Sequence, residues 1–250
     1  MPSSISRLEL DVGNSAIKWR SMAGANRLNG GRVSDFNELA VLAPDTSLIW
    51  VASVANDARN QALRGLFESR GAKVQFAQSA SSQAGVRSAY ADVARMGVDR
   101  WLAMLAAYNE CQRACVVIDA GSALTIDLVD TGGQHLGGYI IPGANMMLQA
   151  LAQNTGRVRF DLEDLPSDKP GVSTEECVHH GKWLALVGAV QRVLAEAAHR
   201  WRQDFSVVVA GGDGAQIAAL VGQAASEWLI RPELVMDGLF FAMADNWGAP

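Results

Sequence analysis

The chain has 250 residues, of which 49% are hydrophobic, enough for one large domain or for two domains of about 100 to 150 residues each. Its 21 basic and 26 acidic residues give a formal net charge of −5, and no run of Lys or Arg occurs, so the composition argues against a nucleic-acid-binding protein. The start, MPSSISRLEL, lacks the apolar segment of a signal peptide, and no run reaches the roughly 18 apolar residues of a membrane span. These features predict a cytoplasmic protein.

Residues 8–20, LELDVGNSAIKWR, predict a β-hairpin whose turn contains Gly13 and Asn14. Asp11 is the unusual residue in this hairpin, because Asp is depleted in strands. A carboxylate beside a glycine turn can hold a metal-bound phosphate while the N–H groups of the turn face the phosphate itself. The alternative is an ordinary surface hairpin.

The next elements alternate between strands and helices. IWVASV at 49–54 is typical of a buried strand, 56–71 of an amphipathic helix that ends at Gly71, and KVQFAQ of a further strand. Residues 98–112 have apolar side chains at helical spacing throughout and predict a core helix.

A second hairpin of the same design follows in VVIDAGSALTIDLV at 116–129, where Asp119 repeats Asp11 and Gly121 repeats Gly13. Such a repeat of a whole supersecondary unit favours two similarly built halves. Further strand character extends to about residue 141, and a long helix is expected from roughly Trp183 to Trp201, followed by a strand at 205–210. The alternation places the chain in the α/β class.

The last of these strands runs into Gly211-Gly212-Asp213-Gly214 and then a helix. Glycines at a helix N-terminus allow the backbone to approach a flat or phosphorylated ligand. The spacing is not G-x-G-x-x-G, so the dinucleotide fingerprint is absent, and an ordinary turn is the alternative.

The cysteines and histidines do not indicate a metal site. No C-x-x-C pair occurs, so neither a disulfide framework nor a zinc site is expected, and buried free thiols are predicted at Cys111, Cys115 and Cys177. His179 and His180 are adjacent but have no further histidine at ligand-like spacing, so a structural role is expected for both.

Four blocks in a fixed order, D11-V-G-N-S-A-I-K18, G97-V-D-R100, D119-A-G-S-A123 and G137-G-Y-I-I-P-G143, resemble the type III pantothenate kinases. These belong to the acetate kinase, sugar kinase, Hsp70 and actin superfamily, and the chain is also similar to the accessory transcription factors described from the same family. The Gly-Gly-Asp segment resembles the adenosine loop of the superfamily. Ser15 and Ser122 stand where the family more often has Thr, which preserves a hydroxyl group.

The resemblance implies two ribonuclease-H-like domains of the actin-like ATPase fold, with a nucleotide cleft between them. Residues 1–113 would contain the first phosphate loop and the acceptor site. Residues 114–250 would contain the second phosphate loop, the adenosine loop and a dimer surface.

For the nucleotide, the resemblance implies a first phosphate loop formed by Asp11, Val12, Gly13, Asn14, Ser15, Ala16, Ile17 and Lys18. Asp11 would orient Mg²⁺ through water, while Lys18 would face the transferred group, as phosphoryl transfer depends on positioning and charge neutralisation. Asp119 resembles a ligand of a monovalent cation, K⁺ or NH₄⁺, and Ser122 a nucleotide-contacting hydroxyl. Without the resemblance, Lys18 would be taken as an exposed strand lysine.

For the acceptor, the resemblance implies that Asp99 is the general base and that the substrate contacts are Tyr90, Gly97, Val98, Asp99, Arg100 and Thr174. The residues themselves leave alternatives open. Asp99 could be a carboxylate that stabilises a helix N-terminus, Tyr90 a packed loop residue, and the segment around Thr174 a capped helix start.

The leading hypothesis is therefore an ATP-dependent kinase that uses Mg²⁺ with ATP, converts pantothenate to 4'-phosphopantothenate in the first step of coenzyme A synthesis and acts as a homodimer. One alternative is a non-catalytic, nucleotide-binding transcription-accessory protein, which would have no need for Asp11, Asp99 and Asp119 together. Another is a phosphatase or nuclease of related fold, which would require clustered carboxylates for two metals.

Overall fold

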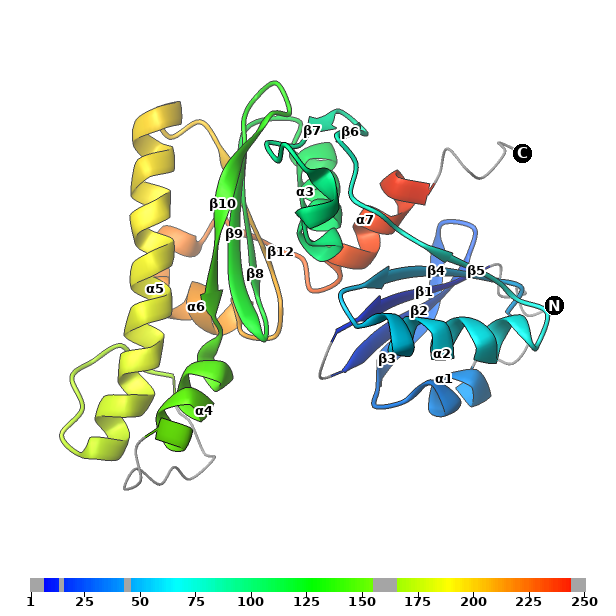
Figure 1. The fold of residues 1–250 in the computed structure, drawn as a ribbon. Helices are drawn as coiled ribbons and strands as arrows, with labels where there is room; N and C mark the ends of the chain where they lie inside the picture. Colours follow the sequence, from blue (N-terminus) through cyan, green and yellow to red (C-terminus); the bar gives the residue numbers. More distant parts are fainter. Residues whose placement is uncertain (1–6, 14–15, 43–45, 155–165, 244–250) are drawn as a thin grey trace. The chain divides into compact units, whose positions relative to one another are not determined.

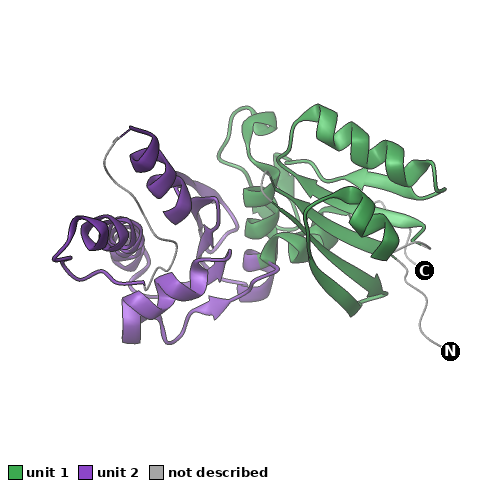
Figure 2. Ribbon diagram, turned by 90° about the horizontal axis from the view of Figure 1, so that it is seen from below, with its two compact units in different colours: residues 1–106, 234–250 green, residues 107–233 purple. Residues whose placement is uncertain are grey.

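The computed structural model describes residues 7–13, 16–42, 46–154 and 166–243. The chain forms two compact units (Figure 2): unit 1 comprises residues 1–106 and 234–250, and unit 2 comprises residues 107–233. The units differ from the halves expected at 1–113 and 114–250, because the chain returns to unit 1 at its last helix. In the described part of the chain, no helix is both long and apolar enough to cross a membrane.

Unit 1 contains a five-stranded sheet in the order β3-β2-β1-β4-β5. Its strands are β1 (Arg7–Val12), β2 (Ile17–Ala23), β3 (Asn26–Val33), β4 (Leu48–Ser53) and β5 (Lys73–Phe76). β1, β2 and β3 form an antiparallel meander, and β4 and β5 continue the sheet in parallel with β1. The remaining elements are α1 (Phe36–Leu42), α2 (Asp57–Glu68), a small β6–β7 hairpin (Ser82–Gln83, Val86–Arg87), the short 3₁₀ helix η1 (Val93–Arg95), α7 (Leu234–Met243) and the first part of α3 (Val98–Cys111), whose residues 107–111 belong to unit 2.

The two faces of this sheet differ in chemistry. Leu8, Leu10 and Val12 of β1 alternate with polar residues and pack with α1 and α2 in one apolar core. On such a two-sided sheet, successive side chains point to opposite faces, so the other face receives Glu9 and Asp11. α7 packs against β1 and β4 on the sheet.

Unit 2 repeats the topology, with a sheet in the order β10-β9-β8-β11-β12. Its strands are β8 (Cys115–Ala120), β9 (Ala123–Val129), β10 (His135–Pro142), β11 (Ser206–Ala210) and β12 (Leu229–Ile230). Three helices, α4 (Ala144–Asn154), α5 (Thr174–Trp201) and α6 (Gly214–Val221), contribute to its core, and the short 3₁₀ helix η2 (Gly222–Ala225) follows α6. Figure 1 shows α5 (yellow) running alongside the strands.

The two matching strand orders confirm the repeat that the two Asp-x-Gly hairpins predict. The long helix of unit 2 was placed too late in the sequence: it begins at Thr174 rather than near Trp183, because Ser173 caps its N-terminus by accepting a hydrogen bond from the N–H of Glu176. The cysteines are free, as expected, but only Cys115 is buried, and Cys177 is exposed on α5.

Candidate active site

The first phosphate loop joins β1 to β2 in unit 1. Asp11 pairs with Lys18 across the two strands, and the Lys18 ammonium lies 3.4 Å from the Asp11 carboxylate. Gly13 donates its N–H to the carbonyl of Ala16 at 3.1 Å, which closes the turn. Asn14 and Ser15 lie outside the described residues. The structure thus brings together Asp11, Val12, Gly13, Ala16, Ile17 and Lys18.

Burial gives Asp11 an unusual titration. It raises the pKa of the Asp11 carboxyl above its ordinary value, although Lys18 opposes the shift. A carboxylate whose pKa is shifted by burial and by a specific charged partner is a candidate for a functional residue. The surface-hairpin alternative does not account for this environment.

Four of the predicted acceptor residues, Gly97, Val98, Asp99 and Arg100, lie at the start of α3. Gly97 precedes the helix, and a Cβ atom at this position would lie only 2.7 Å from Oδ1 of Asp99. The Asp99 carboxylate can therefore fold back over the first turn, where Oδ1 accepts the backbone N–H of Arg100 at 2.7 Å. Both the helix-start interpretation and the acceptor interpretation fit this geometry.

Arg100 and Tyr90 are also in contact. The Arg100 side chain, which is buried, donates to the Tyr90 hydroxyl at 3.0 Å, and its guanidinium lies 5.8 Å from the centre of the ring. The two residues come from different segments, so the contact fixes the loop before η1 against α3. A buried guanidinium beside a tyrosine hydroxyl can present donors to an anionic or polar substrate.

In unit 2 the second phosphate loop lies against the Gly-Gly-Asp segment. Gly211 has φ +86°, and a Cβ atom there would lie 2.1 Å from the carbonyl oxygen of Ala120, so only glycine fits. The same carbonyl accepts the N–H of Asp213 at 2.9 Å. The segment is thus packed against the end of β8, which carries Asp119.

Gly143, the last residue of the fourth block, is a neighbour of the same loop. Its N–H donates to the carbonyl of Ser122 at 3.0 Å, and a Cβ atom would lie 2.3 Å from the carbonyl oxygen of Gly121. The side chain of Ser122 is exposed. The fourth block therefore supports the second loop by its backbone.

Thr174 is the first residue of α5 and is exposed. The carboxylate of Glu176 accepts the N–H of Val172 at 2.7 Å, which completes the capped helix start that the sequence allows. Thr174 also lines a cavity of about 1120 Å³ in unit 2. The cavity lies between α4 and α5, and its other lining residues are Pro142, Met146, Met147, Ala150, Leu151, Gly171, Val172, Ser173, Cys177, Val178, Gly181 and Lys182.

The histidines behave as structural residues. His180 contacts the carbonyl of Lys169 at 2.9 Å, and His179 is buried on α5. Among the residues that the structure describes, no group of three or more His, Cys, Asp or Glu side chains is placed to hold a metal ion. The hydrogen bond of His180 and the burial of His179 fit the structural role that the sequence predicts for both residues.

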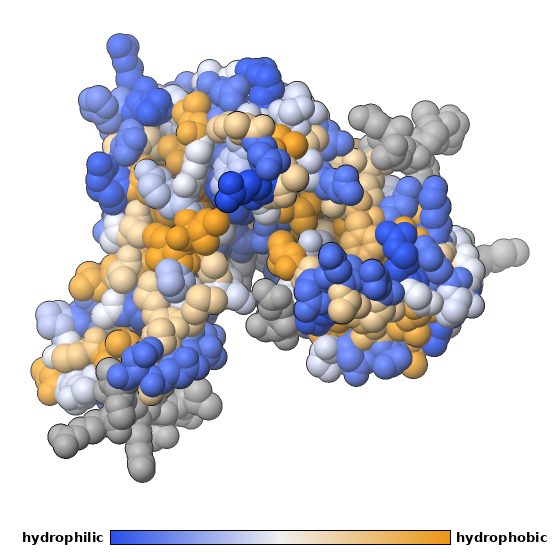
Figure 3. All heavy atoms as spheres, viewed as in Figure 1, coloured by the Kyte–Doolittle hydropathy of each residue, from blue (hydrophilic) through white to orange (hydrophobic). Residues whose placement is uncertain are grey.

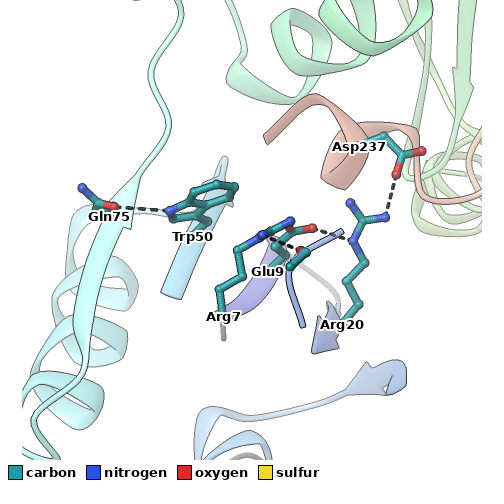
Figure 4. A network of polar contacts seen from close by, with 7 residues as sticks. Arg7, Glu9, Arg20, Trp50, Gln75 and Asp237 are labelled. Carbon is teal, nitrogen blue, oxygen red and sulfur yellow. Dashed lines mark hydrogen bonds and ion pairs between the residues drawn. The ribbon is translucent and has the colours of Figure 1, made fainter. Parts of the chain in front are cut away.

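One network of charged residues was not predicted from the sequence. Glu9 is fully buried and accepts from both Arg7 and Arg20, and Arg20 also donates to Asp237 of α7 (Figure 4). The signal was present in β1, where Arg7, Glu9 and Asp11 alternate with apolar residues. In a strand covered on both faces, such alternation indicates buried charge rather than a solvent-facing side.

Solved structures with a similar fold identify the fold class of the chain. The chain superposes on a Baf-family protein from Campylobacter jejuni with a TM-score of 0.59 at 19% identity, covering 96% of this chain and 98% of that one. A ROK family protein from Streptococcus pneumoniae gives a TM-score of 0.50 at 11% identity, covering 97% and 99%. With its two repeated sheets and paired Asp-x-Gly loops, the chain has the actin-like ATPase fold, as predicted.

The family model described as type III pantothenate kinase matches residues 7–196. A type III pantothenate kinase from Ectopseudomonas mendocina (strain ymp) is 42% identical over 246 residues, covering 94% of this chain and 98% of the relative. One from Marinobacter nauticus is 37% identical, covering 93% and 96%. The chain belongs to the type III pantothenate kinase family, which confirms the resemblance carried by the four sequence blocks.

Proposed function

We propose that the chain transfers the γ-phosphoryl group of ATP to the primary hydroxyl of pantothenate, giving 4'-phosphopantothenate and ADP, in the first step of coenzyme A synthesis. The observation that carries the proposal is the start of α3, where Asp99 and Arg100 lie together and Arg100 binds Tyr90. This grouping, in a chain of the type III pantothenate kinase family, supplies a carboxylate and a donor cluster for the acceptor.

Asp99 would act as the general base. As the hydroxyl oxygen forms its bond to the γ-phosphorus, the bond from that phosphorus to the β,γ-bridging oxygen breaks and ADP leaves with the electron pair. The hydroxyl proton passes to the Asp99 carboxylate. The hydrogen bond from the Arg100 N–H holds that carboxylate in one orientation, and the absence of a side chain at Gly97 leaves room for it.

Arg100 and Tyr90 would bind the acceptor. Pantothenate carries a carboxylate, and a guanidinium provides a planar pair of donors that matches one. Arg100 is buried, so a charge-assisted hydrogen bond to substrate would be weakly screened by water. Val98 and Gly97 would shape the backbone edge of the same site.

Asp11 and Lys18 would serve the phosphates. Mg²⁺ usually keeps several waters and is held by one or two carboxylates together with substrate phosphates, and a single half-buried Asp11 fits that pattern. When bound with ATP, the ion would neutralise charge on the phosphate oxygens. Lys18 would place its ammonium toward the transferred group, and Asn14 and Ser15 would complete the loop.

In unit 2, Ser122 would donate to the nucleotide and the Gly211 segment would lie near its adenosine. Asp119 would take part in binding a monovalent cation, K⁺ or NH₄⁺. The close packing of Gly211 on Ala120 supports this assignment, because it sets the adenosine loop directly beside the strand that ends in Asp119.

We also propose a homodimer formed through unit 2. Large apolar side chains are exposed on β10, α4 and the start of α5, namely Leu136, Tyr139, Ile140, Met146, Leu151 and Val172. Figure 3 shows apolar surface over the face that carries β10 and α4. Contiguous apolar surface of this kind usually marks an interface. A second copy would cover it and bring Thr174 toward the partner's acceptor site.

The test is a coupled ADP-release assay with pantothenate, glycerol, a hexose and other small hydroxy acids, run with ATP and Mg²⁺ and with or without K⁺. We expect ADP release with pantothenate above all other acceptors. Turnover of glycerol or a hexose with none of pantothenate would overturn the proposal. ATP binding without turnover of any acceptor would favour the non-catalytic alternative.

A further inference from the structure

α7 connects two parts of unit 1 that carry candidate site residues. The helix is almost entirely buried and packs against β1 and β4. Its one acidic residue, Asp237, has a side chain that is 42% exposed and accepts a hydrogen bond from Nη1 of Arg20 at 2.6 Å. The helix is thus joined to the sheet by both apolar contacts and a directed ion pair.

On the sheet side, the ion pair continues into the hairpin of the first phosphate loop. Nε of Arg20 donates to one oxygen of Glu9 at 2.5 Å, and Nε of Arg7 donates to the other, also at 2.5 Å. Glu9 lies opposite Arg20 across β1 and β2, and the Leu10–Trp19 pair separates them from the pair of Asp11 and Lys18. Cross-strand pairs two residues apart share a face, so the network is next to the phosphate-loop pair on the same side of the hairpin.

On the other side, α7 touches α3. A Cβ atom at Gly238 would lie 2.2 Å from the carbonyl oxygen of Leu102, so the two helix backbones meet at this glycine. Leu102 is one helical turn after Asp99. In addition, Gln83 donates to the carbonyl of Ala242 at the end of α7, at 3.0 Å. Adjacent residues of α7 therefore contact the hairpin and the helix of the proposed base.

Arg7 is held in a further way. Its guanidinium lies 4.6 Å from the centre of the Trp50 ring, and it donates to the carbonyl of Gly24 at 2.8 Å. Trp50 in turn donates to Gln75 at 3.2 Å (Figure 4). Each charge of the network has directed partners, so the side chains have little freedom to rearrange.

We propose that Arg20 and Asp237 are positioning residues, which hold the β1–β2 hairpin with Asp11 and Lys18 at a fixed distance from the start of α3 with Asp99 and Arg100. A buried ion network is a poor source of stability, because apolar replacements are often as stable, whereas it fixes geometry well. In phosphoryl transfer geometry is what matters, since misplacing a reacting group by about 1 Å can cost about a hundredfold in rate.

The inference rests on the proposed roles of the β1–β2 hairpin and of the start of α3. The test below distinguishes a failure of the positioning role from a failure of the proposed function. Asp237→Asn removes one charge from a half-exposed side chain and leaves the buried Arg20–Glu9 pair in place, so the variant should fold. The matched control is Glu68→Gln, which removes a carboxylate of similar exposure (46%) from the Arg64–Glu68 pair on α2. We expect kcat with pantothenate to fall about tenfold or more in Asp237→Asn and by less than about twofold in Glu68→Gln. The calorimetric affinity for pantothenate should stay within about twofold in both.

A second readout needs no activity. In the ligand-free protein, hydrogen exchange of the amides of residues 7–12 and 17–23 should rise in Asp237→Asn, whereas residues 115–120 and 123–129 of unit 2 should not change. Arg20→Lys keeps the charge but loses the planar fork that joins Glu9 to Asp237, so it should give at least as large an increase in exchange and loss of kcat.

The outcomes are distinct. Unchanged exchange in the hairpin, or a kcat equal to that of Glu68→Gln, would overturn the positioning role. A wild-type protein that does not phosphorylate pantothenate would overturn the proposed function, and in that case hydrogen exchange alone would decide whether α7 holds the hairpin.

Discussion

The two hairpins with an Asp-x-Gly turn share one topology but differ in what lies around their aspartates. In unit 1, the strand positions before Asp11 carry Arg7 and Glu9, whereas in unit 2 those before Asp119 carry Cys115 and Val117. Opposite Glu9 lies Arg20, and opposite Val117 lies Asp127. The two units therefore share a strand topology, whereas the polar contacts of their hairpins differ.

The partners of these residues extend the contrast. Arg20 reaches Asp237 on a helix far away in the sequence, while Asp127 contacts Nε2 of His135 on the neighbouring strand β10 at 3.0 Å. Unit 1 thus holds its loop with a four-residue network of charges, and unit 2 holds its loop by close backbone packing at Gly211 and Gly143. This difference fits the proposed roles, in which the first loop is placed against the proposed base Asp99 and the second loop fits around the nucleotide.

The largest expected effect concerns a residue that has no counterpart role in unit 2. Asp99→Asn keeps size and hydrogen bonding at the start of α3 but removes the proposed base. General-base catalysis is typically worth about 10² to 10⁴ in rate, so kcat should fall by that range. Calorimetric binding of pantothenate should change much less. Near-normal kcat with normal binding would reduce Asp99 to a helix-start carboxylate.

The next effect compares the two polar networks directly. Glu9→Ala leaves two buried arginines without their common acceptor and should cost about 3 to 5 kcal/mol in free energy of unfolding. Asp127→Ala removes one partner of the buried hydrogen bond with His135 and should cost about 1 to 3 kcal/mol. Urea unfolding at pH 7 measures both. Equal losses in the free energy of unfolding would show that the unit 1 network contributes no more to stability than the Asp127–His135 pair.

The fold could be predicted because its signals are local and repeated. Alternating apolar residues and glycine turns mark both hairpins, and helical spacing marks α2 and α3. The capped helix start expected as an alternative around Thr174 is confirmed, but the helix expected from near Trp183 was not extended back to it, because polar residues at 174–180 weaken the apolar period. The return of α7 to unit 1 could not be predicted, since it depends on long-range contacts such as Gly238 with Leu102.

The site was predicted unevenly for the same reason. Asp11 with Lys18, and Asp99 with Arg100, are neighbours in a strand pair or in sequence, so motifs reveal them. Tyr90 contacts Arg100, and the substrate-binding role that the family resemblance implies for both residues stays a prediction. The link from Arg20 to Asp237 spans almost the whole chain, and no local pattern specifies which acidic residue will meet a given arginine.

A smaller effect tests whether the units of two copies share one site. Arg100→Ala in unit 1 and Thr174→Arg in unit 2 should each lower activity strongly. If Thr174 serves the partner's acceptor site, each mixed dimer contains one intact site of its two, so mixed dimers isolated through both tags should have about half of wild-type activity. The measurement is ADP release after the two variants are co-expressed and purified with different tags. No recovery would place both residues in one protomer's site or remove Thr174 from the site.

The smallest expected effect concerns the loss of stability that the burial of the Asp11 carboxylate causes in unit 1. Because burial raises the pKa of Asp11 above its ordinary value near 3.8, the folded state binds more protons than the unfolded state between those two pKa values. Stability therefore falls as pH rises through that window, and the ionised carboxylate is unfavourable above it.

Asp11→Asn should then raise the free energy of unfolding slightly at pH 7.5, and the gain should shrink as the pH is lowered toward 4. Lys18 loses a partner in the variant, but it is partly exposed, so that loss should be minor. Urea unfolding at several pH values measures the difference, with Asp204→Asn, a change at an exposed carboxylate, as the control. A variant that is less stable than the wild type at pH 7.5, with no trend in pH, would show that Asp11 is a stabilising partner of Lys18 and that its burial has no cost.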